Sequence, residues 1–210
     1  MAKKSLQERR EQRLRARRGA LPQRRRGRHL AAGRRALQPR RHALPAAAAA
    51  RVSVERSALK ELFAAMAAEG VDYVLVGGVA VNLHGIVRAT EDADLFVRPD
   101  AENVARLRHA LQRVTGDRDV EGIREEDLAG AYPVVRYVSP DGRLTVDILS
   151  RLGERFAYGD LEAEVMELDG VEVRVATPAT LWRMKRDTVR AVDAEDAARL
   201  QAAFDLAEEP

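Results

Sequence analysis

The chain has 210 residues, of which 46% are hydrophobic and 33% are charged, enough for one principal domain with a core. It contains no cysteine, which excludes a disulfide framework, a thiolate zinc site and cysteine nucleophile chemistry. Its apolar runs are far shorter than the roughly 20 residues of a membrane-spanning helix, and its first residues contain no apolar segment of a secretory signal. We therefore expect a cytoplasmic protein without a membrane partner.

The formal net charge of +3 combines two unlike parts of the chain. Residues 1–50 hold 16 Lys and Arg against two acids, whereas residues 51–210 hold 20 basic and 31 acidic residues. The first part has the composition of a disordered basic arm, which we expect over 1–52. Three interpretations of this arm stay open: a nucleic-acid-binding tail, an inert solvated arm, or translated sequence upstream of the natural start. The rest, 53–210, is the expected folded domain.

The first predicted element is a helix over 57–69, with Ser57 near its N-cap and Gly70 just beyond its last turn. Its large apolar residues recur at helical spacing and predict one buried face. They are Leu59, Leu62, Phe63 and Met66.

A short buried strand is expected over 73–76, followed by one or two helical turns over 79–84. The alternation of polar and apolar residues predicts a second strand over 92–97. An amphipathic helix follows over 99–114, and the polar stretch 116–131 is a loop or a short helix.

Two hairpins come next, one joining 134–138 to 144–149 and one joining 164–168 to 171–175 through an Asp-Gly turn. Thr177 followed by proline begins the C-terminal helices, because threonine caps a helix and proline suits its first position. This order of elements predicts a mixed α/β (α+β) layer fold.

The first candidate site feature is Gly77-Gly78, at the point where a strand ends and a helix begins. Backbone N–H groups and the positive end of the helix dipole would face the space beyond the strand, which suits a phosphate. Glycine matters there because a side chain would hold the backbone away from the anion.

The second feature is a group of acids. Asp92 and Asp94 are one residue apart on a predicted strand, so both carboxylates project from the same face. Carboxylate pairs suit Mg²⁺, which takes a few carboxylates together with substrate phosphates. Asp147, in an otherwise apolar strand, is the candidate for the third carboxylate of a two-metal site.

These residues together resemble the DNA polymerase beta-like nucleotidyltransferase superfamily. Its pattern is Gly-Gly or Gly-Ser after a strand, about a dozen residues, Asp-x-Asp, and a third acid on a later strand. The closer resemblance is to the AbiEii-type bacterial nucleotidyltransferases, many of which are toxins of toxin–antitoxin systems. It is carried by Arg88-Ala-Thr-Glu-Asp-Ala-Asp and by Lys185 with Arg190-Ala-Val-Asp-Ala-Glu-Asp196. Gly78 stands where many relatives carry serine, and Val192 where they carry a basic residue.

The resemblance implies a mixed-sheet nucleotidyltransferase palm with flanking helices over 53–210. It implies transfer of a nucleoside monophosphate from an NTP to a hydroxyl of an RNA or tRNA 3′ end or of a protein, with a possible cognate antitoxin. Two Mg²⁺ ions, or Mn²⁺, would be held by Asp92, Asp94 and Asp147, and Asp147 would also accept the hydroxyl proton. The implied phosphate-binding residues are Gly77, Gly78, Arg88 and Lys185.

Two other functions stay open: a small-molecule (antibiotic) nucleotidyltransferase, and a non-catalytic module whose basic arm binds nucleic acid. Several residues also have a purely structural interpretation. Arg88 would be a solvated loop charge, His84 a packing residue, and Lys185 an exposed side chain with its stem on the neighbouring tryptophan. Asp193 and Asp196 would be acids in the first turn of a helix, where they complement its dipole.

Overall fold

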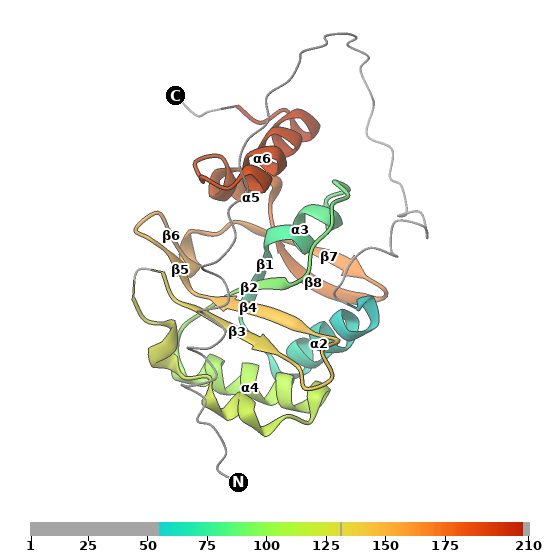
Figure 1. Cartoon of the computed structure of the whole chain (residues 1–210), viewed down its shortest axis with the longest axis vertical. Coiled ribbons are helices and arrows are strands. Elements are labelled where there is room, and N and C mark those ends of the chain that lie inside the picture. The colour runs from blue at the N-terminus through green and yellow to red at the C-terminus, as the bar shows by residue number, and fades with distance from the viewer. Residues whose placement is uncertain (1–54, 131, 208–210) are drawn as a thin grey trace, which may run out of the picture. The chain divides into compact units, whose positions relative to one another are not determined.

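A six-stranded mixed sheet lies at the centre of the computed structural model of the chain (Figure 1). The structure describes residues 55–130 and 132–207, so the predicted basic arm over 1–52 lies outside the described residues. The described residues belong to one compact unit.

The strand order in the sheet is β3-β4-β2-β1-β8-β7. Strands β2 and β4 pair in parallel, as do β1 and β8, while the other neighbours are antiparallel. The bounds of the strands are Tyr73–Val76 for β1, Ala93–Val97 for β2, Val134–Val138 for β3, Thr145–Leu149 for β4, Ala163–Leu168 for β7 and Val171–Ala176 for β8.

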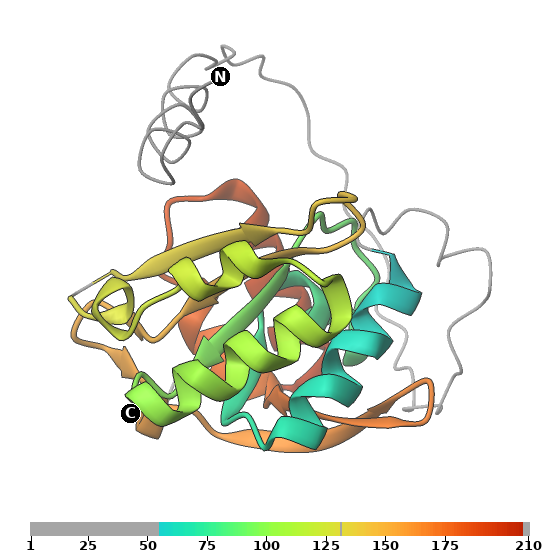
Figure 2. The ribbon, with the colours of Figure 1, turned by 90° about the horizontal axis from the view of Figure 1, so that it is seen from below.

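The helices form two groups around this sheet. Helices α2 (Arg56–Glu69) and α4 (Ala101–Thr115) pack on each other and cover one face, as Figure 2 shows from below. Helix α3 (Gly77–Leu83) follows β1 directly, and α5 (Pro178–Lys185) and α6 (Ala191–Phe204) pack on each other beside it (Figure 1). The short elements are η2 (Arg118–Gly122), η3 (Glu125–Leu128), the hairpin β5 (Arg151–Leu152) and β6 (Phe156–Ala157), and η4 (Tyr158–Asp160).

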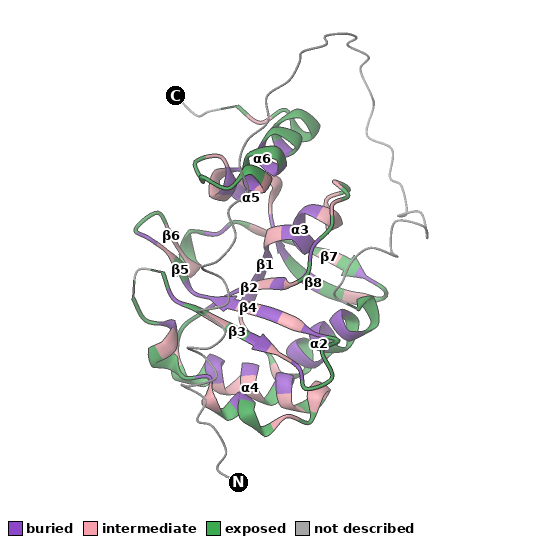
Figure 3. Cartoon of the chain, viewed as in Figure 1, coloured by how far each residue is buried: buried purple, intermediate pink, exposed green. Residues whose placement is uncertain are grey.

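The core lies between the sheet and the α2–α4 layer, where the central strands β1, β2 and β4 are largely buried (Figure 3). The predicted apolar face of the first helix is confirmed, since each of its four large residues is buried. Among the described residues, no helix is long and apolar enough to cross a membrane. The largest fully buried side chains include Leu62, Phe63, Met66, Leu75, Phe96, Leu107 and Leu111.

The predicted fold class is confirmed, with three local corrections. The N-cap of α2 is Glu55, not Ser57, and no side chain bonds there. Helix α3 begins at Gly77, directly after β1 ends at Val76, and not at residue 79 as expected. The β5–β6 hairpin was not predicted, because strands of two residues carry no readable periodicity. Thr177 caps α5 as predicted, accepting a hydrogen bond from the Thr180 N–H.

Candidate active site

Three aspartates gather at one end of β2 and its neighbours. The parallel register of β2 and β4 sets Asp94 opposite Asp147, and Asp92 lies immediately before β2. On the other side, Asp94 pairs with Val76, the last residue of β1. The structure thus brings the three predicted carboxylates together and sets them beside the glycines that begin α3.

The environment of Asp94 opposes its ionisation. Enclosure by the protein, followed by the negative charges of Asp92 and Asp147, raises its pKa to about 7. The Lys185 charge and a hydrogen bond from the Gly78 N–H act in the opposite direction without cancelling the rise. Burial and the two neighbouring carboxylates therefore both disfavour the ionised form of Asp94.

The raised pKa predicts a pH dependence of stability for the metal-free protein. Folding favours the protonated form of Asp94, since its pKa is higher in the folded than in the unfolded chain. This contribution to the unfolding free energy is complete below about pH 4 and is lost as the pH rises through about 7. Urea unfolding in EDTA from pH 5 to 8 should show wild type losing stability relative to Asp94→Asn. If the unfolding free energies of wild type and Asp94→Asn changed in parallel with pH, the raised pKa of Asp94 would be contradicted.

The close approach of Asp94 to the backbone of Gly77 requires a glycine at this position. Its φ is +68°, in the left-handed region, and a Cβ built on it would lie 1.8 Å from Oδ2 of Asp94. A larger residue at this position therefore forces the carboxylate to move.

Gly78 leaves room for two side chains of the loop between α3 and β2. A Cβ there would lie 2.4 Å from Nη1 of Arg88 and 2.5 Å from Oγ1 of Thr90. The Thr90 hydroxyl in turn donates to the Asp92 carbonyl over 3.2 Å. The place that a serine side chain would occupy is therefore filled by Arg88 and Thr90.

The backbone of Arg88 is held by Asn82 of α3. The Asn82 side chain accepts from the Arg88 N–H over 2.8 Å and donates to its carbonyl over 3.0 Å. Arg88 Nη1 lies 3.5 Å from Oδ2 of Asp196, while its buried Nε finds no hydrogen-bond partner in the described part of the chain. Arg88 is thus a fixed side chain with an unused donor, and not a solvated loop charge.

Lys185 is buried in an ion network between α5 and α6, so the interpretation as an exposed side chain is wrong. Its Nζ lies 2.8 Å from Oδ1 of Asp193 and 2.9 Å from Oδ2 of Asp196. Asp193 also accepts from the Thr188 hydroxyl over 3.1 Å. Both acids are buried, so complementing the helix dipole is not their main interaction.

We predict a large loss of stability for Lys185→Met. Removing one partner of a buried ion pair leaves its charges uncompensated, which costs about 3–5 kcal/mol of unfolding free energy. Adding Asp193→Asn and Asp196→Asn to Lys185→Met should recover much of that loss, as followed by urea unfolding. The control is Arg199→Met, which breaks an exposed pair with Glu195 and should change stability by about 0.5 kcal/mol or less. Equal effects of the two single variants would refute this account.

Sequence reasoning missed Arg136, which contacts two of the three carboxylates. From β3, its Nε donates to Oδ1 of Asp147 over 2.6 Å and its Nη2 to Oδ2 over 2.8 Å. Nη2 also contacts Asp92. The signal was present in the predicted hairpin, because a register that pairs Val138 with Thr145 necessarily pairs Arg136 with Asp147.

The remaining candidate, His84, is a packing residue as its structural interpretation proposed. Its ring is 4% exposed, with Nε2 2.8 Å from the Ala176 carbonyl oxygen and its plane edge-on to Phe204. It takes no part in the group of carboxylates.

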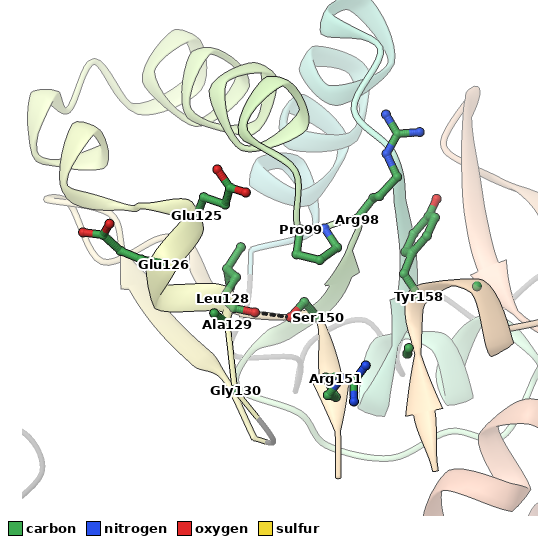
Figure 4. Close-up of a pocket in the computed structure, with 12 residues that line it drawn as sticks. Arg98, Pro99, Glu125, Glu126, Leu128, Ala129, Gly130, Ser150, Arg151 and Tyr158 are labelled. Carbon is green, nitrogen blue, oxygen red and sulfur yellow. Dashed lines mark hydrogen bonds between the residues drawn. The ribbon is translucent and has the colours of Figure 1, made fainter. Parts of the chain in front are cut away.

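A cavity of about 990 Å³ opens at the opposite end of β2 and β4 (Figure 4). Arg98 and Tyr158 stand on one side of it and Glu125 on the other, and the Ser150 hydroxyl donates to the Leu128 carbonyl over 2.6 Å. None of the three aspartates lines this cavity. It is therefore separate from the candidate active site.

The carboxylate oxygens are the ligand type that Mg²⁺ and Mn²⁺ prefer. Within 55–130 and 132–207, no three His, Cys, Asp or Glu side chains already stand in the arrangement of a metal site. Mg²⁺ commonly uses one or two carboxylates and completes its shell with water and substrate phosphates. The residues therefore fit such an ion in donor type and charge, with Arg136 now holding two of the carboxylates.

Residues 57–199 match the family model described as "Nucleotidyl transferase AbiEii toxin, Type IV TA system". The chain therefore belongs to the AbiEii family of nucleotidyltransferases. This membership confirms the predicted enzyme class, a transferase with an NTP as its donor substrate. The comparison with curated proteins found no match.

Three solved structures are similar to the chain at low identity. One is a putative nucleotidyltransferase from Thermotoga maritima, at 15% identity, 71% coverage of this chain and 91% of that chain, and a TM-score of 0.43. Another is ANT(2″)-Ia in complex with adenylyl-2″-tobramycin, with 16% identity, 71% and 89% coverage, and a TM-score of 0.43. The third is an antigenic nucleotidyltransferase-like protein from Paracoccidioides brasiliensis, with 18% identity, 70% and 75% coverage, and a TM-score of 0.46.

Proposed function

We propose that this nucleotidyltransferase is metal-dependent and that Asp92, Asp94 and Asp147 are its metal-binding and catalytic residues. The observation that carries the proposal is the β2–β4 register, which sets Asp94 opposite Asp147 at the end of these strands that lies beside Gly77, the first residue of α3. A group of like charges in which one pKa is strongly raised is typical of functional sites.

The proposed cofactor is Mg²⁺, bound as two ions, and Mn²⁺ would be able to replace it. When bound, it would neutralise charge on the triphosphate and at the α-phosphate. Asp92 and Asp94 supply ligands from the start of β2, and Asp147 supplies one from β4. The negative charges of Asp92 and Asp147, which contribute to the raised pKa of Asp94, support this assignment because a divalent cation would offset them.

Gly77, Gly78 and Arg88 are the proposed phosphate-binding residues. The absence of a side chain lets Asp94 approach Gly77 closely, and it lets Arg88 pack against Gly78 with its Nε–H unused. For Lys185, the ion pairs with Asp193 and Asp196 support a positioning role behind Asp94. Direct contact of Lys185 with phosphate stays a prediction.

The proposed reaction is transfer of a nucleoside monophosphate from the NTP to the acceptor hydroxyl. The acceptor hydroxyl oxygen bonds to the α-phosphorus, the bond from that phosphorus to the bridging oxygen breaks, and pyrophosphate leaves. Asp147 is the proposed acceptor of the hydroxyl proton. Catalysis comes mainly from positioning and charge neutralisation, because the protein contributes little covalent chemistry to such a transfer.

For the acceptor we propose a hydroxyl of RNA, such as a tRNA 3′ end, or of a protein, in the setting of a toxin with a cognate antitoxin. The description of the family as a toxin of a type IV system supports this setting. The net negative charge of 51–210 means that RNA would need a local basic groove or the arginine-rich first 50 residues.

The test is a transfer assay with each of the four α-labelled NTPs and with three acceptors: total RNA, total protein and an aminoglycoside. We expect Mg²⁺-dependent label on a macromolecule with a preference for one nucleotide. If the acceptor is RNA, the rate should fall steeply with salt, because phosphate contacts release counterions. Label on the aminoglycoside alone would replace this proposal with the small-molecule function. No transfer to any acceptor, with intact binding of nucleic acid, would favour the non-catalytic module.

A further inference from the structure

Arg136 contacts two carboxylates at once from the edge strand β3. Its guanidinium makes a bidentate pair with Asp147, at 2.6 Å and 2.8 Å, and reaches Asp92 with the same Nη2. Bidentate pairs of this kind are among the stronger charge-assisted hydrogen bonds. Both oxygens of Asp147 are thus engaged by one side chain.

Arg136 engages two of the three carboxylates that the proposed function assigns to a divalent cation. Arg136 occupies lone pairs on both oxygens of Asp147 and on one of Asp92, and its positive charge repels a cation at the same place, so the two compete. A single positive charge beside three carboxylates also compensates them less completely than a divalent ion does. Arg136 therefore lowers the affinity of the site for the cation that it would hold.

The Arg136 side chain is placed where it can move away from the two carboxylates. Its side chain is 33% exposed, and β3 is the outermost strand of the sheet, so a change of rotamer disrupts no core packing. Its partners, at 18% exposure for Asp147 and 25% for Asp92, stay fixed on β4 and at the start of β2.

We propose that Arg136 is a positioning residue that holds Asp92 and Asp147 together in the metal-free protein and is displaced by the divalent cation. This inference rests on the proposed function. It has two linked consequences: removing the guanidinium tightens cation binding and destabilises the metal-free protein, because unpaired carboxylates then repel each other.

The experiment measures Mn²⁺ binding to the full chain by the loss of the free-ion EPR signal. Arg136→Gln should bind Mn²⁺ about tenfold more tightly than wild type, with Arg136→Lys in between. The control is Arg143→Gln, in the same hairpin, which loses exposed ion pairs with Asp141 and Glu55 and should bind Mn²⁺ like wild type. Thermal unfolding is the second readout: saturating Mn²⁺ should raise the midpoint of Arg136→Gln by more than that of wild type.

Equal or weaker Mn²⁺ binding by Arg136→Gln, with wild type binding normally, would overturn the inference and leave the proposed function intact. If neither protein binds Mn²⁺ more tightly than Asp92→Asn plus Asp94→Asn, the metal site of the proposed function fails and the inference fails with it. Binding by Arg136→Gln but not by wild type would support the competition most strongly. Mn²⁺ binding by Arg136→Lys alone, seen as loss of the free-ion EPR signal, would count against the inference, because lysine retains the positive charge.

Discussion

Asp94→Asn should reduce nucleotidyl transfer by about 10³-fold or more, because it removes a ligand charge worth several kcal/mol of transition-state stabilisation. Asparagine keeps the shape of the side chain and can still accept the Gly78 N–H. It also removes the repulsion from Asp92 and Asp147, so the metal-free variant should be at least as stable as wild type at pH 8.

The measurement is initial rate against Mg²⁺ concentration, together with urea unfolding in EDTA. The matched control is Glu91→Gln, an exposed acid in the loop just before β2. We expect the control to retain the wild-type rate. Equal losses in both variants, or a destabilised Asp94→Asn, would mean that Asp94 acts through the fold and not through its charge.

Gly77→Ala should reduce activity about 10²-fold and lower the unfolding free energy by about 1–3 kcal/mol. The added methyl would lie 1.8 Å from Oδ2 of Asp94, so the carboxylate must leave its position opposite Asp147. The left-handed φ of +68° adds the strain of an L side chain, about 1 kcal/mol.

Gly85→Ala separates these two effects. Gly85 also has a left-handed φ, +88°, but a Cβ there meets no atom within 4 Å. It should therefore lose stability without losing activity. If both variants are equally active, the close approach of Gly77 to Asp94 has no catalytic importance.

The features that sequence predicted well are those fixed by local pattern. The carboxylate pair at Asp92 and Asp94, the glycines at the end of β1 and the cap at Thr177 depend on residue type and short spacing. Asp147 was predicted to join them because an acid in the middle of the apolar strand β4 is unusual, and the structure sets it opposite Asp94. These positions required no knowledge of how distant elements pack.

The features that were missed depend on contacts between distant elements. Arg136 reaches Asp92 only because β2 and β3 both flank β4, and sequence does not show that parallel pairing. Lys185 is buried because α6 folds back on α5 and brings Asp193 and Asp196 to it. Serine has a strong preference for N-caps, yet the helix starts before Ser57, which shows the limit of local propensity.

Nucleotidyl transfer at the carboxylates of β2 and β4 can be tested with one paired measurement. The full chain is incubated with Mg²⁺, total RNA and protein, and the preferred NTP labelled either at the α- or at the γ-phosphate. We expect the α-label to enter the acceptor and the γ-label to leave as pyrophosphate. Both processes should stop in the double variant Asp94→Asn plus Asp147→Asn. Transfer of the γ-label, or undiminished α-transfer by the double variant, would contradict nucleotidyl transfer at these carboxylates.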